Sequence, residues 1–266
     1  MKLGLIGGGF MGEAILSAVI ARGVAAPGDI AVAEINDERR AAIASKHGVR
    51  TTAEPAGAVT GSDIVLFAVK PQEFDVIARG LKGSLASNQV AASIMAGVPI
   101  AKLQRALGHP AIARVMPNTP ASIGEGMSVW TATAEVDADA RARVSSLLSV
   151  LGQEIYVEDE KYLDMATALS GSGPGFVYLL VEAFIDAGVH IGFRRDVAEK
   201  LVLQTFLGSA KYAQVTGKHP AQLRNEVTSP GGTTAAGLFA LEDAGVRAAI
   251  IDAVEAAFER SKELGG

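Results

Sequence analysis

The chain begins with a short apolar run that passes directly into glycines, and this junction constrains its fold more than any other feature. Residues 3–7 are a candidate strand, residues 7–12 read G-G-G-F-M-G, and residues 11–22 have a helical pattern. A G-x-G-x-x-G match is informative in this strand–turn–helix context. There Gly7 permits a tight turn, Gly9 lets a pyrophosphate approach the backbone, and Gly12 allows close helix–sheet packing. We predict a dinucleotide site here, with a merely flexible turn as the alternative.

Strand and helix patterns alternate through the first part of the chain and give way to helices alone near residue 160. Alternating strands and helices predict a doubly wound parallel sheet. The predicted fold is a Rossmann-like α/β domain over residues 1–158, followed by an all-α domain over residues 159–266. The predicted strands are 3–7, 30–34, 49–52, 64–69, 90–94 and 113–116, with edge strands 127–133 and 154–157; the later helices are 161–169, 175–191, 196–215, 220–227, 234–243 and 246–264.

Composition narrows the function classes. The 266 residues carry a net charge of −5, which argues against nucleic acid as the main partner. The absence of cysteine excludes disulfides and thiolate metal sites, and the four dispersed histidines give no metal-ligand spacing, so no metal is expected. The N-terminus does not resemble a signal peptide. The sequence contains no run of about 18 apolar residues, so it predicts no membrane span. We expect a cytoplasmic protein without a membrane partner.

Residues 176–191 are apolar on nearly every face of the expected helix, with Glu182, Asp186 and His190 as the exceptions. A helix that is apolar all round must be buried. About 105 helical residues make a small core, and neighbouring helices are also rich in apolar residues. We therefore favour a second copy of the chain as the cover, with a central helix of a monomeric bundle as the alternative.

Several residues at predicted strand ends are candidates for the nucleotide site, because ligands of open parallel sheets lie beyond the carboxyl ends of the strands. Glu34 ends the second strand, where an acid can bond the adenosine ribose and favour NAD. Arg39 and Arg40 follow on a helix, where they either meet a 2′-phosphate of NADP or face solvent, so the cofactor choice stays open. Lys70 is either at the cofactor or a surface lysine. Residues 93–97 and 117–120 hold equivalent positions on the nicotinamide side.

Two uncharged, glycine-rich segments precede helices in the second part of the chain. Residues 227–242 read V-T-S-P-G-G-T-T-A-A-G-L-F-A-L-E and carry no charge before Glu242. Backbone N–H groups at such a helix start suit a small carboxylate, although an ordinary capped helix start is the alternative. Residues 169–175, L-S-G-S-G-P-G, lack the G-x-S-x-G spacing of a serine hydrolase. They line a substrate pocket or allow close helix packing.

The combination of motifs resembles the pyrroline-5-carboxylate reductase family over essentially the full length. The motifs are G-G-G-F-M-G at 7–12, A-V-K-P at 68–71, N-T-P at 118–120, L-S-G-S-G-P at 169–174 and T-S-P-G-G-T-T-A-A-G-L-F-A-L-E at 228–242. The resemblance implies reduction of 1-pyrroline-5-carboxylate to L-proline, the last step of proline biosynthesis. It implies NADPH as the cofactor, with NADH as an alternative. It also implies a homodimer formed through the helical domain, with a larger ring of dimers as a further assembly.

Site residues follow from the motifs and from the resemblance together. Thr234 is the expected catalytic residue, since its hydroxyl can bond the ring nitrogen of the substrate. Pro55, and the segment 34–36, depart from the family pattern and put the cofactor preference in doubt. The expected substrate-binding residues are Glu160, Ser229, Gly231, Gly232, Thr233 and Thr234, and the expected cofactor-binding residues are Gly7, Gly9, Phe10, Met11, Gly12, Glu34, Ala68, Val69, Lys70, Pro71, Ala96 and Asn118.

Two other function classes remain as alternatives. One is a hydroxyacid or imine dehydrogenase of the same two-domain plan. Many such enzymes carry a catalytic lysine in the first long helix of the helical domain, and residues 176–185 contain none. The other is a regulatory protein that senses a nucleotide without turnover, for which the uncharged loop at 228–234 would have no use.

Overall fold

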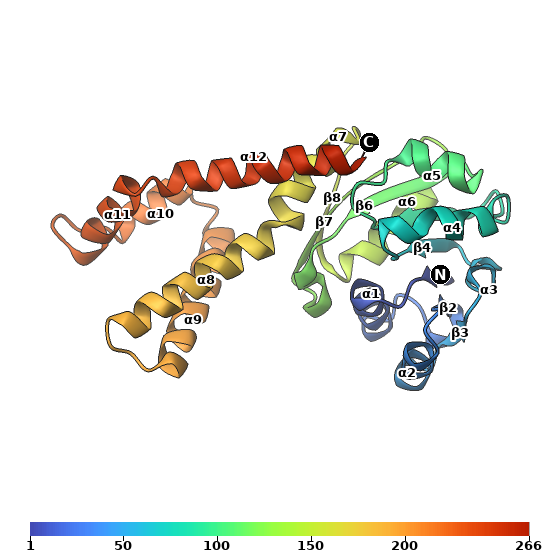
Figure 1. The fold of residues 1–266 in the computed structure, drawn as a ribbon, viewed down its shortest axis with the longest axis horizontal. Helices are drawn as coiled ribbons and strands as arrows, with labels where there is room; N and C mark the ends of the chain where they lie inside the picture. The colour runs from blue at the N-terminus through green and yellow to red at the C-terminus, as the bar shows by residue number, and fades with distance from the viewer. Residues whose placement is uncertain (266) are drawn as a thin grey trace. The chain divides into compact units, whose positions relative to one another are not determined.

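A computed structural model describes residues 1–265, and its first part is the predicted doubly wound sheet (Figure 1). Eight strands lie in the order β3-β2-β1-β4-β5-β6-β7-β8, and neighbours are parallel except β6 and β7. The two strands expected at the edge are both present, but only β8 is an edge strand, because β7 pairs with β6 on one side and with β8 on the other. The strand bounds are Leu3–Ile6 (β1), Ile30–Ala33 (β2), Arg50–Thr52 (β3), Ile64–Phe67 (β4), Val90–Ser93 (β5), Ile112–Met116 (β6), Gly126–Ala132 (β7) and Gly152–Tyr156 (β8).

Alternate side chains of the central strands enter two separate apolar cores, one on each face of the sheet. In β4, Leu66 belongs to one core and Phe67 to the other, as the two-residue repeat of a strand dictates. The first core is covered by α1 (Phe10–Ala21), α2 (Asp37–His47) and α6 (Ala138–Ser149). The second is covered by α3 (Pro55–Val59), α4 (Pro71–Leu81) and α5 (Ile100–Leu107). Strands buried on both faces explain the nearly continuous apolar runs in the sequence.

The second part of the chain is helical, as predicted, and its helices are α8 (Gly173–His190), α9 (Arg195–Thr216), α10 (Pro220–Glu226), α11 (Thr233–Asp243) and α12 (Val246–Gly265). Helices α8 and α9 form a hairpin in which the rings of Phe184 and Phe206 meet edge to face at 5.4 Å. Hardly any of their side chains are buried: α8, α10 and α11 have no buried residue, and α9 has only Ala198.

The chain separates into two compact units, and the boundary lies later than the change from strand to helix. The first unit is Met1–Ser172 together with the end of α12 from Ala257, and the second is Gly173–Ala256. The sequence placed its division at residue 158, where strand patterns stop. The short helix α7 (Lys161–Ala166) joins the first unit because its residues Leu163 and Ala166 are buried there.

The continuous stretch Lys161–His190 is long and apolar enough, by length and hydropathy alone, to cross a membrane, with a mean hydropathy of 1.4. The sequence prediction did not single out this stretch, because it considered only uninterrupted apolar runs. Isolated acidic residues such as Glu182 lower the mean hydropathy only a little. Length and composition do not distinguish a membrane span from a helix that another protein surface covers.

Candidate dinucleotide and substrate sites

The glycine-rich turn joins β1 to α1, and each glycine of the predicted motif has a distinct structural reason. Gly7 has a φ of +99°, and a Cβ there would lie 2.6 Å from the Ala68 carbonyl oxygen. A Cβ on Gly12 would lie 2.2 Å from the Gly7 oxygen. Gly9 is the residue before α1, no side chain caps the helix there, and a Cβ on it would meet nothing within 4 Å. The open side of this turn and the first N–H groups of α1 fit a pyrophosphate.

The other predicted cofactor residues lie at the carboxyl ends of strands, as expected. Ala68 and Val69 follow β4, and the exposed Lys70 precedes α4, whose first residue is Pro71. Ala96 follows β5 and is half-buried. From the glycine-rich turn, Phe10 is 66% exposed, whereas Met11 packs against the first core.

Asn118 follows β6, and its side-chain amide holds two other segments in place. Its Nδ2 donates to the Ser170 carbonyl oxygen at 3.1 Å, and its Oδ1 accepts from the Met127 backbone N–H at 2.9 Å. Ser170 belongs to a π-helical turn, Thr167–Gly171, that links α7 to α8. A Cβ on Gly171 would lie 2.5 Å from the Met116 side chain. Close packing therefore accounts for the first glycine of the 169–175 segment. The π-helical turn was not predicted, because an extra residue in a helical turn leaves no periodic signal.

Glu34 closes the carboxyl end of β2 and reaches back to the glycine-rich turn. Its Oε2 accepts the Gly8 backbone N–H at 2.9 Å, and its Oε1 accepts the Asn36 N–H at 2.9 Å. The two arginines that follow are turned toward the protein. Arg39 donates to the Gly8 carbonyl oxygen and pairs with Glu13 at 3.3 Å. Arg40 pairs with Asp37 at 2.6 Å and donates to the Glu34 carbonyl oxygen at 3.0 Å.

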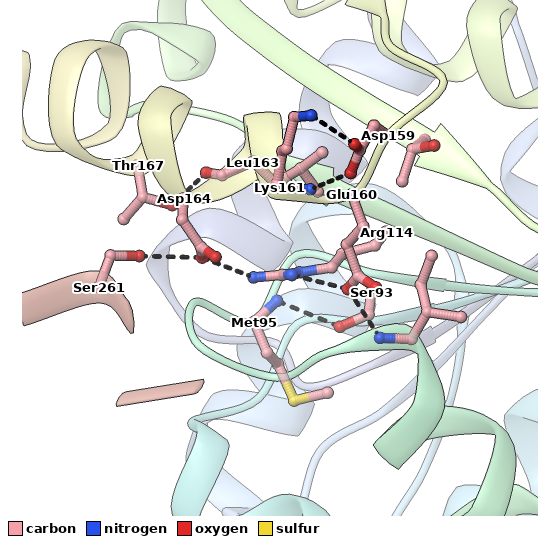
Figure 2. Close-up of polar contacts among 12 residues, drawn as sticks. Ser93, Met95, Arg114, Asp159, Glu160, Lys161, Leu163, Asp164, Thr167 and Ser261 are labelled. Atoms are coloured by element: carbon pink, nitrogen blue, oxygen red, sulfur yellow. Dashed lines mark hydrogen bonds and ion pairs between the residues drawn. The ribbon is translucent and has the colours of Figure 1, made fainter. Parts of the chain in front are cut away.

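A buried arginine that was not predicted joins several segments of the first unit (Figure 2). Arg114 lies in β6 and is 5% exposed. Its Nη1 donates to Glu160 Oε1 at 2.7 Å, and its Nη2 contacts Asp164 Oδ1 at 3.3 Å. Asp164 also accepts from the hydroxyl of Ser261 in α12 at 3.1 Å. A single charge inside the apolar strand I-A-R-V-M was the available signal, because a buried charge needs partners.

Glu160 therefore lies in an ion-pair network next to the loop that carries Ala96. Its Oε1 also accepts the backbone N–H of Ile100, the first residue of α5, at 2.8 Å. The same loop touches the end of α12, because a Cβ on Gly97 would lie 2.9 Å from the Leu264 Cβ. The network thus joins α5, β6, α7 and the end of α12 around the loop after β5.

The predicted carboxylate loop lies in the second unit, at the start of α11. Gly231 has a φ of +68°, and the Gly232 N–H donates to the Ser229 carbonyl oxygen at 3.0 Å. Gly232 precedes α11, and no side chain caps that helix. Ser229, Thr233 and Thr234 are all exposed. The ordinary capped helix start considered from the sequence is therefore not what the structure has.

The glycine turn after β1, the acid at the end of β2 and the doubly wound sheet define a dinucleotide-binding protein of the Rossmann type. Residues 2–97 match the family model described as NADP oxidoreductase, coenzyme F420-dependent, and residues 160–264 match pyrroline-5-carboxylate reductase dimerisation. The chain belongs to the pyrroline-5-carboxylate reductase family, because full-length relatives of that name share 38–44% of its residues.

Four comparisons illustrate the likeness. The pyrroline-5-carboxylate reductase of Synechocystis sp. is 44% identical, with 100% of this chain and 98% of the relative covered. That of Pisum sativum is 42% identical, with 98% and 95% covered. The solved enzyme from Coxiella burnetii is 35% identical to this chain, with a TM-score of 0.92. The solved Plasmodium falciparum enzyme with NADP bound is 32% identical, with a TM-score of 0.91. Each of these two alignments covers 100% of this chain and 98% of the solved chain.

Proposed function

We propose that this chain reduces the C=N bond of 1-pyrroline-5-carboxylate to give L-proline. The observation that carries the proposal is the uncapped, uncharged start of α11 in a chain that also has the open glycine turn of a dinucleotide site. When bound, the reduced nicotinamide supplies a hydride to the carbon of the C=N bond. The nitrogen gains one proton, so the cyclic imine becomes a cyclic amine. Residues of this chain must bind the carboxylate, orient the ring and deliver that proton.

The loop before α11 is proposed to hold the substrate carboxylate. Its backbone N–H groups at Gly231, Gly232 and Thr233, with the hydroxyl of Ser229, are the donors. Helix-terminus electrostatics contribute about 0.3–2 kcal/mol to such binding. Fixing the ring against the cofactor is the larger effect, because orienting two reactants is worth up to ~7–11 kcal/mol. An uncharged loop suits this task, since the reaction depends on position more than on charge.

Thr234, in the first turn of α11, is proposed to bond the ring nitrogen. A threonine hydroxyl is a poor general acid at neutral pH, so its role is to orient the nitrogen and relay a proton from water. Glu160 was expected to bind the substrate. Its bonds from Arg114 and Ile100 to one oxygen favour a positioning role, in which it holds the start of α5 beside the loop that carries Ala96.

The proposed cofactor set keeps every position predicted from the sequence, because all of them lie in the first unit at the glycine turn or at strand ends. The family resemblance implies NADPH, with NADH as the alternative, and either one satisfies the reaction. Asn118 is proposed to act on the cofactor through the π-helical turn that its amide holds.

Self-association through the helical unit is part of the proposal, and a larger ring of dimers is its further form. The exposed apolar side chains of α8 and α9 and the match of residues 160–264 to a dimerisation family support a second subunit as the cover. The same cover makes a membrane unnecessary for the apolar stretch Lys161–His190. We propose that the enzyme works in the cytoplasm without a membrane partner.

The direct test is oxidation of NADH and of NADPH in the presence of 1-pyrroline-5-carboxylate, followed at 340 nm. Oxidation with at least one cofactor is expected, and none with either would refute the proposed reaction.

Thr234→Ala should lower turnover by about 10- to 1000-fold, because assisted proton transfer is typically worth 10²–10⁴-fold. The cofactor affinity should change little. Thr234→Ser keeps the hydroxyl and should retain most of the turnover; a loss below twofold in Thr234→Ala would exclude the proposed role.

A further inference from the structure

A cleft of about 650 Å³ opens beside the carboxyl ends of β1 and β2, where the adenosine half of a dinucleotide lies in a Rossmann fold. The charged residues that line it are Glu34, Glu54 and Glu73. The described residues that line it include no arginine, lysine, histidine, serine or threonine. A 2′-phosphate adds close to two negative charges and three acceptor oxygens, and this lining offers it repulsion and few donors.

Glu34 is fixed in this cleft by both of its carboxylate oxygens. The Gly8 and Asn36 backbone N–H groups donate to Oε2 and Oε1, each at 2.9 Å. A carboxylate has about four acceptor positions, so each oxygen can still accept a hydroxyl hydrogen from a ribose. The side chain is held at the end of β2, where the 2′- and 3′-hydroxyls of an adenosine ribose are bound. It is therefore arranged to accept a free 2′-hydroxyl and to repel a phosphate.

The two arginines of α2 nearest to Glu34 are committed to other contacts. Arg39 donates to the Gly8 oxygen and pairs with Glu13. Arg40 spans the Glu34 carbonyl oxygen and Asp37. Neither arginine lines the cleft. A phosphate would have to replace these contacts before it could gain an ion pair.

The N-terminus of α2 is a further electropositive feature at this edge, and it too is occupied. Asn36 caps the helix, with its Oδ1 accepting the Arg39 N–H at 2.8 Å. Asp37 and Glu38 stand in the first turn, where acidic side chains already complement the helix dipole. An anion approaching this helix start would meet two carboxylates.

We propose that Glu34 makes this enzyme select NADH over NADPH. The inference rests on the proposed oxidoreductase function and reverses the cofactor order that the family resemblance implies. Both cofactors carry the same nicotinamide, so the selection acts on binding and leaves the hydride step unchanged.

The test is calorimetric titration of the full-length protein with NAD⁺ and with NADP⁺, without substrate. The wild type should bind NAD⁺ at least about tenfold more tightly, because the like charge of the half-buried Glu34 carboxylate opposes the 2′-phosphate. Glu34→Gln keeps the size and removes the charge, and it should reduce that ratio by about tenfold or more, chiefly by tighter NADP⁺ binding. Glu135→Gln removes an exposed carboxylate outside the cleft and should leave the ratio unchanged.

Each outcome separates this inference from the proposed reaction. Equal or tighter binding of NADP⁺ by the wild type, or an unchanged ratio in Glu34→Gln, would overturn the inference even if the enzyme reduces 1-pyrroline-5-carboxylate. The expected ratios in a protein that does not reduce this imine would leave the inference standing and refute the reaction. A protein that binds neither nucleotide would overturn both.

Discussion

The two units of this chain bury their apolar residues very differently. In the first unit, both faces of the sheet are filled, and side chains such as Leu5, Leu66 and Phe67 are at most 1% exposed. In the second unit, α8, α10 and α11 contain no buried residue, and Leu179, Leu207 and Phe239 are 64%, 64% and 73% exposed. The first unit is complete as a single chain, whereas the second requires a surface that the chain does not supply.

This difference predicts that binding of the cofactor and binding of the substrate depend on assembly to different degrees. The glycine turn, Glu34 and the strand-end loops all belong to the self-contained unit, so we expect dinucleotide binding to need only one chain. The loop before α11 and Thr234 belong to the unit with uncovered helices. Binding of the substrate should therefore depend on the second subunit, and binding of the cofactor should not.

The largest expected effect comes from placing a charge on the uncovered helices. Leu207→Asp should raise the dissociation constant of the dimer by about 100-fold or more, because burial of one leucine is worth about 1.5–3 kcal/mol and a symmetric dimer loses two. Sedimentation equilibrium gives the dissociation constant, and calorimetry should show dinucleotide affinity unchanged within about twofold.

Ile123→Asp is the matched control, since Ile123 is 77% exposed on the first unit. It should leave the assembly intact. If Leu207→Asp associates as tightly as the wild type, α9 does not face the partner and the contrast between the units needs another explanation.

The sequence predicted the fold well because the strands and turns of the first unit are determined by residues that are close together in the sequence. Continuous apolar runs identified its strands, and glycines identified the turn after β1. The sequence also predicted that residues 176–191 need a cover. It could not place the compact boundary at Ser172, because the position of α7 depends on contacts such as that between Asp164 and Arg114, which are 50 residues apart.

The candidate site was predictable where motifs are dense and not where it depends on distant partners. The motif residues at 7–12, 68–71 and 228–234 lie at a helix start or strand end, as predicted. The bonds that engage Glu160, and the Asn118 bond to Ser170, join residues separated by 46 to 60 positions. No periodicity encodes such pairs. Likewise, the sequence left the arginines undecided because the contacts of Arg39 with Gly8 and Glu13 depend on how α2 packs.

A smaller effect should follow from removing the charge at the centre of the first unit's ion-pair network. Arg114→Met leaves Glu160 and Asp164, whose side chains are 31% and 24% exposed, without their cation. We expect the free energy of unfolding to fall by about 2–3 kcal/mol, less than the ~3–5 kcal/mol for fully buried pairs because solvent reaches the carboxylates. Urea titration followed by tryptophan fluorescence measures it through Trp130, which is in β7.

Arg79→Met is the control, because Arg79 is exposed on α4, and it should change stability by less than about 0.5 kcal/mol. An equally small effect of Arg114→Met would mean that the two apolar cores alone hold α7 and the end of α12 in the first unit.

The smallest effect should come from the surface of the first unit, at Glu13 in α1. Hydrogen bonds from Lys46, then His47, lower the pKa of the Glu13 carboxyl below its usual 4.5. A lowered folded-state pKa adds stability above the unfolded pKa, and that stability is lost as the pH falls through the folded value. Glu13→Gln should therefore cost about 0.2–1 kcal/mol at pH 7 and progressively less as the pH falls below about 4. Urea titrations of both proteins across this range provide the measurement. A cost that stays constant with pH would show that the contact stabilises through packing, and a cost of several kcal/mol would mean that the stability of this unit depends on its surface as well as on its two cores.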